Sequence, residues 1–227
     1  MRTILTYTGL LLIMFCPSCA KQKESDAYEK DGAESSYIAV KGDKDVSLDA
    51  GSYVSWFRSQ EHGFKKRKTL NDLTYFLQYK SPEYIALIES HGEGIKKDSV
   101  EKRSKELQGL IYFDFSISLK GGQDELLKYQ INSPADYQER VKYMSFDMQK
   151  DIKLVQDKDT ISCGLYHFER IYDIGPYSNY LLAFDSKGID LNKELTFVFN
   201  DKVFHNGLVK FTFSGGKLIY LPKLRIS

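Results

Sequence analysis

The chain has 227 residues, with 32 Lys and Arg against 31 Asp and Glu and a formal net charge of +1. Such a balance argues against binding to nucleic acid, and against holding a membrane surface through a basic patch. Aromatic residues make up 14% of the chain, mostly Tyr and Phe, with Trp56 the only tryptophan. This profile is typical of β-strands.

The first residues predict a secretory signal peptide. Arg2 supplies a positive charge, and an uncharged, mostly apolar run at residues 4–15 follows it. A cationic start, an apolar segment of about 7–15 residues and then small residues form such a signal. The apolar run is too short for a transmembrane helix, which needs about 20 residues. We therefore expect residues 1–18 to be cleaved off.

Two cysteines, Cys16 and Cys19, follow in the stretch "FCPSCAKQKES". A redox C-x-x-C motif is expected near a βαβ pattern, and none surrounds this one. The stretch resembles the lipobox of bacterial lipoproteins, in which an apolar segment and a small residue precede the modified cysteine. Ser18 stands before Cys19 and fits this pattern, whereas the bulky Phe15 before Cys16 does not.

The resemblance implies that Cys19 carries lipid and anchors the protein to a membrane, since two or more acyl chains anchor stably. Ala20 follows Cys19 in place of the Asp that resembles an inner-membrane retention signal, so the outer membrane is favoured over the inner. Cys16 would leave with the signal peptide. Cys163 is then the only free thiol, which excludes a disulfide within the chain.

Residues 19–36 are nearly all charged, small or polar. Such a segment cannot bury a core, and we interpret it as a disordered tether that follows the lipidated cysteine. The remaining residues, 37–227, are predicted to form one β-rich globular domain.

Strand signals fill most of this domain. In "LIYFDFSISLK" the apolar residues Ile111, Phe113, Phe115, Ile117 and Leu119 alternate with more polar ones. This period of two predicts a strand with one buried and one wet face, as in antiparallel sheets. Further strands are predicted at residues 64–70, 74–80, 145–156, 160–172, 179–185, 194–200, 207–214 and 217–221. The last two should form a tight hairpin around Gly215-Gly216.

Three short helices are predicted, in "SPEYIALIES", "DSVEKRSKELQG" and "SPADYQERVKY". Ser81 and Ser133 are N-cap candidates with a proline directly after them, and Asp98 or Ser99 would cap the middle helix. The fold class is therefore mainly β, an antiparallel β-sandwich with a few short helices. The alternative is an α+β arrangement in which the helices pack on one antiparallel sheet.

The stretch "CGLYHFER" combines Cys163, His167 and Glu169, which are nucleophile, base and orienting residue types. On a regular strand, however, the Cα atoms of Cys163 and His167 would lie ~13 Å apart. Because a nucleophile and its base need contact at about 3 Å, no catalytic residue is assigned here. His167 and Glu169 are interpreted as a cross-strand polar pair.

The four histidines (His62, His91, His167 and His205) are scattered without the spacing of metal ligands. No P-loop, G-x-S-x-G or G-x-G-x-x-G motif occurs. The sequence therefore predicts neither a metal site nor a cofactor.

The run "FKKRKTL" places Lys65, Lys66 and Arg67 in a row, not far from Trp56. These residues would suit an acidic glycan or a headgroup, with the indole stacking on a sugar or contacting a protein. The alternatives are an edge strand whose lysines oppose aggregation and a tryptophan buried in the core. We keep these residues as candidates for binding.

The stretches "YHFERIYDIGPY" and "ELTFVFNDKVFHNGLVKFTFSGGKLIYLPKL" resemble a type of bacterial lipoprotein without an established activity, which implies no functional residue. The features together favour a lipid-anchored lipoprotein of the cell envelope, a non-enzymatic module that binds or assembles an envelope protein or glycan. The alternative is a hydrolase of envelope polymers or glycans. It would use two of Glu93, Asp114 and Glu169, held about 5–10 Å apart, as acid and base.

Overall fold

The computed structural model describes residues 45–90, 94–122, 125–169 and 177–226, all within one compact unit, Ser35–Ser227. The predicted signal peptide, Cys19 and the tether lie outside the described residues, as do His91 and Glu93. In the part that is described, the prediction of a mainly β fold with antiparallel sheets and a few short helices is confirmed. No helix of these residues is long and apolar enough to cross a membrane.

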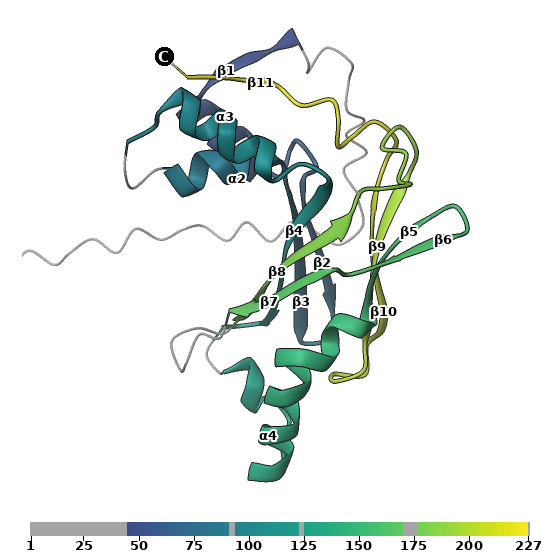
Figure 1. The fold of residues 1–227 in the computed structure, drawn as a ribbon. Helices are drawn as coiled ribbons and strands as arrows, with labels where there is room; N and C mark the ends of the chain where they lie inside the picture. Colours follow the sequence, from purple (N-terminus) through teal and green to yellow (C-terminus); the bar gives the residue numbers. More distant parts are fainter. Residues whose placement is uncertain (1–44, 91–93, 123–124, 170–176, 227) are drawn as a thin grey trace, which may run out of the picture. The chain divides into compact units, whose positions relative to one another are not determined.

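Two antiparallel sheets dominate the described residues (Figure 1). One has the order β2-β3-β4-β8-β7, and its strands are Lys65–Leu70, Leu73–Lys80, Leu110–Leu119, Tyr177–Asp185 and Leu165–Glu169. The other has the order β10-β9-β5-β6, and its strands are Gly207–Phe213, Leu195–Asp201, Ile152–Gln156 and Asp159–Ser162. We call them the five-stranded and the four-stranded sheet.

The core lies between these sheets and is rich in aromatic rings. Phe113 and Phe115 of β4 point inward and are fully buried. The Phe115 ring lies 5.3 Å from the rings of both Phe197 and Phe199 on β9, and the Phe113 ring lies 5.6 Å from that of Phe213 on β10. Each such side chain contributes roughly 1.5–3 kcal/mol through burial. The contacts make the two sheets a sandwich.

Two helices, α2 (Pro82–Glu89) and α3 (Lys97–Glu106), pack on one end of the outer face of the five-stranded sheet. Ala86, Val100 and Leu107 form a second apolar cluster there with Tyr112 of β4 and Ala183 of β8. The arrangement therefore also contains the helix-on-sheet packing of the alternative fold. As predicted, Ser81 caps α2, its Oγ accepting from the Tyr84 N–H at 3.1 Å.

The third predicted helix is α4 (Pro134–Lys142), where the Ser133 Oγ accepts from the Asp136 N–H at 3.2 Å. The N-cap of α3 is Lys96, and neither Asp98 nor Ser99 takes that place. A fourth helix, α1 (Ala50–Arg58), was not predicted. It is capped by Asp49 and buries Tyr53 and Phe57, one helical turn apart. A short parallel pair, β1 (Ser47–Asp49) and β11 (Lys223–Arg225), completes the architecture.

The predicted strand at 145–156 is wrong in its first half. A π-helical turn, η4 (Tyr143–Asp147), and a 3-10 turn, η5 (Met148–Asp151), precede β5, which begins only at Ile152. Met144 and Met148 are four residues apart and both fully buried. That spacing is helical, and it outweighs the strand-like composition of the segment.

The predicted strand at 160–172 is also wrong as one element. It breaks at Cys163 and Gly164, where the chain leaves the four-stranded sheet (β6) and enters the five-stranded one (β7). The Gly164 N–H donates to the Ala183 carbonyl at 2.9 Å, which starts the pairing of β7 with β8. Residues 170–172 lie outside the described part.

The predicted hairpin around Gly215-Gly216, with a strand at 217–221, is not formed, because residues 215–219 make turns. The Gly216 N–H donates to the Leu191 carbonyl at 2.8 Å. A Cβ at Gly215 would lie 2.1 Å from the Asn192 carbonyl oxygen. The two glycines therefore let the chain pass close beneath the loop before β9.

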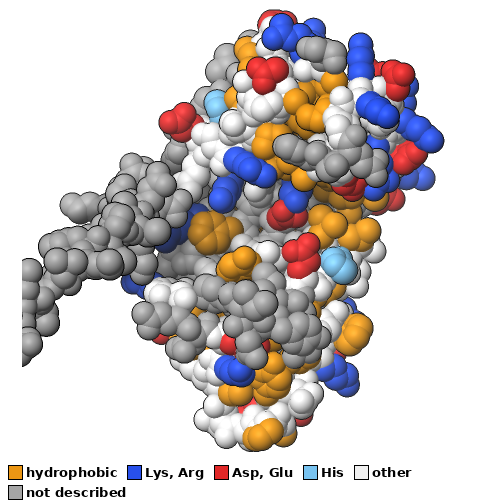
Figure 2. All heavy atoms as spheres, turned by 90° about the vertical axis from the view of Figure 1, so that its left-hand side faces the viewer, with side chains coloured by type: hydrophobic (Ala, Val, Ile, Leu, Met, Phe, Trp, Pro, Cys, Tyr) orange, Lys and Arg blue, Asp and Glu red, His pale blue; other side chains and the backbone are white. Residues whose placement is uncertain are grey.

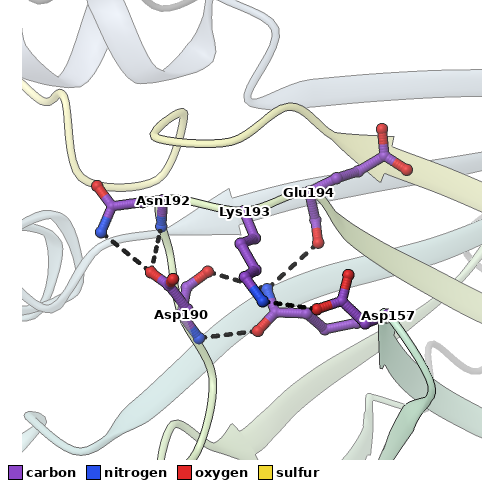
Figure 3. Close-up of polar contacts among 6 residues, drawn as sticks. Asp157, Asp190, Asn192, Lys193 and Glu194 are labelled. Atoms are coloured by element: carbon purple, nitrogen blue, oxygen red, sulfur yellow. Dashed lines mark hydrogen bonds and ion pairs between the residues drawn. The ribbon is translucent and has the colours of Figure 1, made fainter.

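That loop, which carries Asp190, Lys193 and Glu194 (Figure 3), is held by the buried side chain of Gln156 at the end of β5. Its amide nitrogen donates to the carbonyls of Asp190 at 2.9 Å and Glu194 at 3.2 Å, and its oxygen accepts from the Asp190 N–H at 2.8 Å. Lys193 reaches Asp157 in the β5–β6 turn at 2.8 Å. These bonds satisfy the loop backbone, so we assign the cluster a structural role.

Candidate functional site

The side chains that alternate away from the core give the five-stranded sheet a second face, only one end of which α2 and α3 cover. The register aligns Arg67 with Phe76, Asp114 with Leu181, and Leu181 with His167 across neighbouring strands. We call the part that these two helices leave uncovered the open face. Its side chains include Lys65, Arg67, Phe76, Lys80, Asp114, Leu181, His167 and Glu169. Figure 2 shows cationic, acidic, histidine and apolar side chains around a recessed area on this side of the molecule.

Two cations flank an aromatic ring at one edge of the open face. The Lys65 Nζ and the Arg67 guanidinium carbon each lie 5.7 Å from the centre of the Phe76 ring. Phe76 is half-buried, so part of its ring stays accessible. Cations at this distance are attracted to the ring, and together they offer a ligand positive charge and an apolar surface.

The other residues of the basic run point the opposite way. Lys66 lies over the Phe213 ring of β10 at 5.3 Å, and the Lys68 Nζ donates to the Lys210 carbonyl at 3.5 Å. The structure thus separates Lys66 from Lys65 and Arg67. Because β2 and β10 are the edge strands of their sheets, Lys66 and Lys68 sit where lysines oppose edge-to-edge pairing.

An ion pair lies nearer the middle of the open face, between Lys80 of β3 and Asp114 of β4. Their side chains are 23% and 42% exposed, so water screens the pair only in part. Burial raises the pKa of Asp114 above its ordinary value, Lys80 lowers it, and the charge of Glu169 on β7 raises it further. The charge of Glu169 therefore acts on Asp114 from the far side of β8.

His167 and Glu169 are exposed on β7, the edge strand of the sheet. His167 stands level with Leu181, which stands level with Asp114. Asp114 and His167 consequently flank the half-buried Leu181 on the two neighbouring strands. Lys80 pairs with Asp114, and Glu169 follows two residues after His167 on β7. Groups of both charges around an apolar centre are suited to holding a polar ligand that also has an apolar part.

Cys163 does not belong to this face. Its side chain is 6% exposed and lies in the core, where the Sγ donates to the Leu165 carbonyl at 2.9 Å. Burial raises the pKa of the thiol to about 12, so it is almost wholly protonated at neutral pH. No Cys163–His167 dyad forms, because the chain crosses between sheets at Cys163, and His167 faces outward.

Trp56 lies on α1 and is half-buried. Its ring stacks on His62 at 4.4 Å and contacts Phe57 at 5.2 Å and Phe64 at 5.0 Å. Much of the indole surface is thus used in packing within the domain. The described residues hold no group of three or more His, Cys, Asp or Glu arranged to bind a metal ion.

Phe76, Lys80 and Leu181 are the members of the open face that the sequence analysis did not single out. Phe76 and Lys80 fall at alternate positions of "LTYFLQYK", opposite in phase to the buried Tyr75, Leu77 and Tyr79. This alternation was a sequence signal from which the outward orientation of Phe76 and Lys80 could have been predicted. The partners of Lys80 and the neighbours of Leu181 depend on strand order, which the sequence does not state.

No protein-family model matches the chain, and no curated protein matches it significantly. Among solved structures, it is similar to the crystal structure of a DUF4426 family protein from Pseudomonas aeruginosa PAO1. The match covers 66% of this chain and 92% of that one, with 12% sequence identity and a TM-score of 0.31. Values this low carry no argument about fold or function.

Proposed function

We propose that this chain is a lipid-anchored lipoprotein of the bacterial cell envelope, with the outer membrane favoured, whose domain binds an envelope protein or glycan without catalysis. The anchor rests on the signal-like residues 1–18 and the lipobox-like position of Cys19. The observation that carries the binding role is the open face. On this face, Lys65 and Arg67 flank the ring of Phe76. The Lys80–Asp114 ion pair and the side chains of His167 and Glu169 lie on the same partly accessible surface of the sheet.

A binding role also fits the chemistry of the groups nearby. The thiol that would serve best as a nucleophile is buried with a raised pKa, whereas a reactive cysteine needs exposure and a lowered pKa. Asp114 is engaged by Lys80. Lys65, Arg67 and His167 instead offer donors to acceptor groups such as carboxylates, phosphates and sugar hydroxyls.

Photo-crosslinking of the anchored full chain in cells tests the binding role. A photoreactive phenylalanine at His167 should give a discrete adduct, and the same residue at Lys158, exposed in the β5–β6 turn, should not. Charge reversal at Arg67 (Arg67→Glu) should weaken the His167 adduct. Equal adducts from both positions, or none from His167, would count against binding through the open face.

The anchor has its own test. Replacing Cys19 by Ala should abolish labelling with a radioactive fatty acid and release the protein from membranes, whereas Cys16→Ala should leave both intact. Labelling that follows Cys16 would contradict the assignment.

A second candidate function is hydrolysis of envelope glycans, favoured by one observation. Asp114 combines a raised pKa with the influence of a second carboxylate, Glu169, and such pairs serve as acid and base in glycosidases. Release of reducing ends from envelope polysaccharide should then be lost in both Asp114→Asn and Glu169→Gln. Wild-type protein that releases none would exclude this candidate for that substrate.

A further inference from the structure

A groove separate from the open face lies between α3 and the carboxyl-terminal segment, residues 219–226. Its volume is about 620 Å³. Val100 of α3 and Leu221, Leu224 and Ile226 of the terminal segment give it apolar walls, and charged side chains from α2, α3 and β11 also line it. This mixed lining differs from the dry interior expected of a site for a purely apolar molecule.

One wall of the groove is a strand edge. Lys223 and Arg225 of β11 face β1 in the parallel register, and the Lys223 N–H donates to the Val46 carbonyl at 2.8 Å. Because the backbone groups of successive strand residues point to opposite sides, the N–H and C=O of Leu224 point away from β1. Among the described residues, no backbone hydrogen bond joins that second edge of β11 to another strand.

The position of β11 puts this edge toward the groove. β11 lies between β1 and α3 (Figure 1), and both Leu224 and α3 residues line the groove. The Leu224 side chain packs against the apolar clusters of the domain, and among the described residues no strand pairs with its backbone N–H and C=O. A strand edge of this kind accepts an extended backbone in particular, because donors and acceptors then alternate at matching spacing.

The charges at the groove favour an acidic ligand. Lys97 and Glu101 interact with each other at 3.9 Å. The other charged residues that line the groove are one carboxylate, Glu83, and two lysines, Lys105 and Lys223. The lining therefore carries one more positive than negative charge. Both lysines are exposed, so they are free to approach a carboxylate.

We propose that this groove binds an extended, acidic peptide segment of a partner protein, which adds as a third strand to the free edge of β11 and contacts α3 with its other edge. Alternate peptide side chains would meet the apolar wall, and acidic ones would meet Lys105 and Lys223. The proposal rests on a surface other than the open face, so it stands or falls separately from the proposed function.

Fluorescence anisotropy with the full chain and the labelled peptide Asp-Val-Thr-Val-Glu tests the proposal. Saturable binding is expected. Two versions of the peptide provide the decisive control, one N-methylated at both Val residues and the other at Thr and Glu. Since these sets of N–H groups point to opposite strand edges, one version should bind about tenfold more weakly and the other nearly as well as the parent. Equal affinity of the two versions, or no saturable binding of the parent, would overturn the proposal.

Charge reversal separates the groove from a general attraction to the protein. The double variant Lys105→Glu/Lys223→Glu should weaken peptide binding about tenfold. Lys102→Glu, on α3 but outside the groove lining, should not. A thermal melt of each variant verifies folding. Equal weakening of peptide binding by Lys102→Glu would overturn the proposal. Dimerisation of the wild type that depends on concentration, and that only the double variant abolishes, would also overturn it, because a second copy of the chain would then occupy the groove.

Discussion

The two faces of β4 contrast sharply. Residues 111, 113, 115, 117 and 119 are buried between the sheets, and Phe113 and Phe115 contact rings from β9 and β10. On the other face, Asp114 and Ser116 are only half-buried, and Asp114 pairs with Lys80. Under the proposed function, one strand would serve both stability and recognition. The inner face is constrained by packing, whereas the outer face is free to carry polar groups that packing does not require.

The largest expected effect comes from truncating the inner face. Phe113→Ala should lower the free energy of unfolding by about 3–5 kcal/mol, because it removes a fully buried ring and leaves a cavity. Ser116→Ala, on the same strand but the outer face, should change it by no more than about 0.5 kcal/mol. Denaturant titration of both variants measures this. Similar losses would show that the outer face is packed as tightly as the inner.

The buried thiol should give the next largest effect, as a dependence on pH. Burial raises its pKa from the ordinary 9.0 to about 12 in the folded state. The unfolded chain therefore releases the proton first as pH rises, and stability falls between pH 9 and 12. Near pH 10–11 the fall attributable to Cys163 should approach about 1.4 kcal/mol per pH unit.

Cys163→Ala should reduce that slope, although it also lowers stability at neutral pH. The buried tyrosines contribute a similar slope to both proteins, so the difference between them isolates the thiol. In the folded wild type, iodoacetamide should modify Cys163 slowly at neutral pH, and far faster after unfolding. Fast labelling of the folded protein that His167→Ala suppresses would contradict the separation of the two residues.

A smaller effect is expected on the outer face, at the ion pair. Lys80→Met should lower the free energy of unfolding by about 0.5–1 kcal/mol at pH 7, since the pair is part-exposed and screened. Because Lys80 lowers the pKa of Asp114 in the folded state, removing the lysine should raise that pKa further. A carboxylate whose pKa is higher in the folded than in the unfolded state lowers stability at pH values above its unfolded-state pKa, and has no effect well below that pKa, where both states are protonated. The stability lost in Lys80→Met should therefore disappear by about pH 3. A double-mutant cycle with Asp114→Asn isolates the coupling. A loss that persists at pH 3 would mean that Lys80 acts through packing.

The smallest expected effect compares neighbours within β2. Lys66→Ser should cost up to about 1 kcal/mol, because the Lys66 Nζ lies over the Phe213 ring on the inward side. Lys65→Ser should cost less, because Lys65 borders the open face at 5.7 Å from the half-buried Phe76 ring. Paired thermal melts would resolve the difference. A larger loss of stability in Lys65→Ser than in Lys66→Ser would contradict the assignment of Lys66 to the inner face and Lys65 to the outer face of β2.

The inner face was predictable because burial imposes a period of two on its residues, and burial alternates without a break from Phe113 to Leu119. Tyr112 departs from this pattern, because it is buried on the outer face in the apolar cluster with Val100 of α3. Helix caps were predictable at Ser81 and Ser133, where a serine and a proline act locally. The segments around Met144 and Gly215 were not, because tertiary contacts decided them. Two buried methionines one turn apart favoured a helical turn, and a passing loop required the glycines.

The open face shows the same limit. Arg67 and Asp114 were named from the sequence as single candidates, but their neighbours follow from the order β2-β3-β4-β8-β7. The sequence favoured one strand from 160 to 172, and the crossing at Cys163 is what places His167 and Glu169 beside β8. Long-range pairing of this kind has no local signature in the chain.

The crossing at Cys163 and Gly164 has a dynamic consequence. On that side of the sandwich, only two residues, Cys163 and Gly164, connect β6 of one sheet to β7 of the other. On the opposite side, β2 and β10 meet in the described residues through side chains such as Lys66 and Lys68. Local opening begins where the fewest constraints must be released. The amides of β2 and β10 should therefore exchange with solvent deuterium ahead of those in β4 and β9, with the crossing acting as the hinge about which the two sheets part.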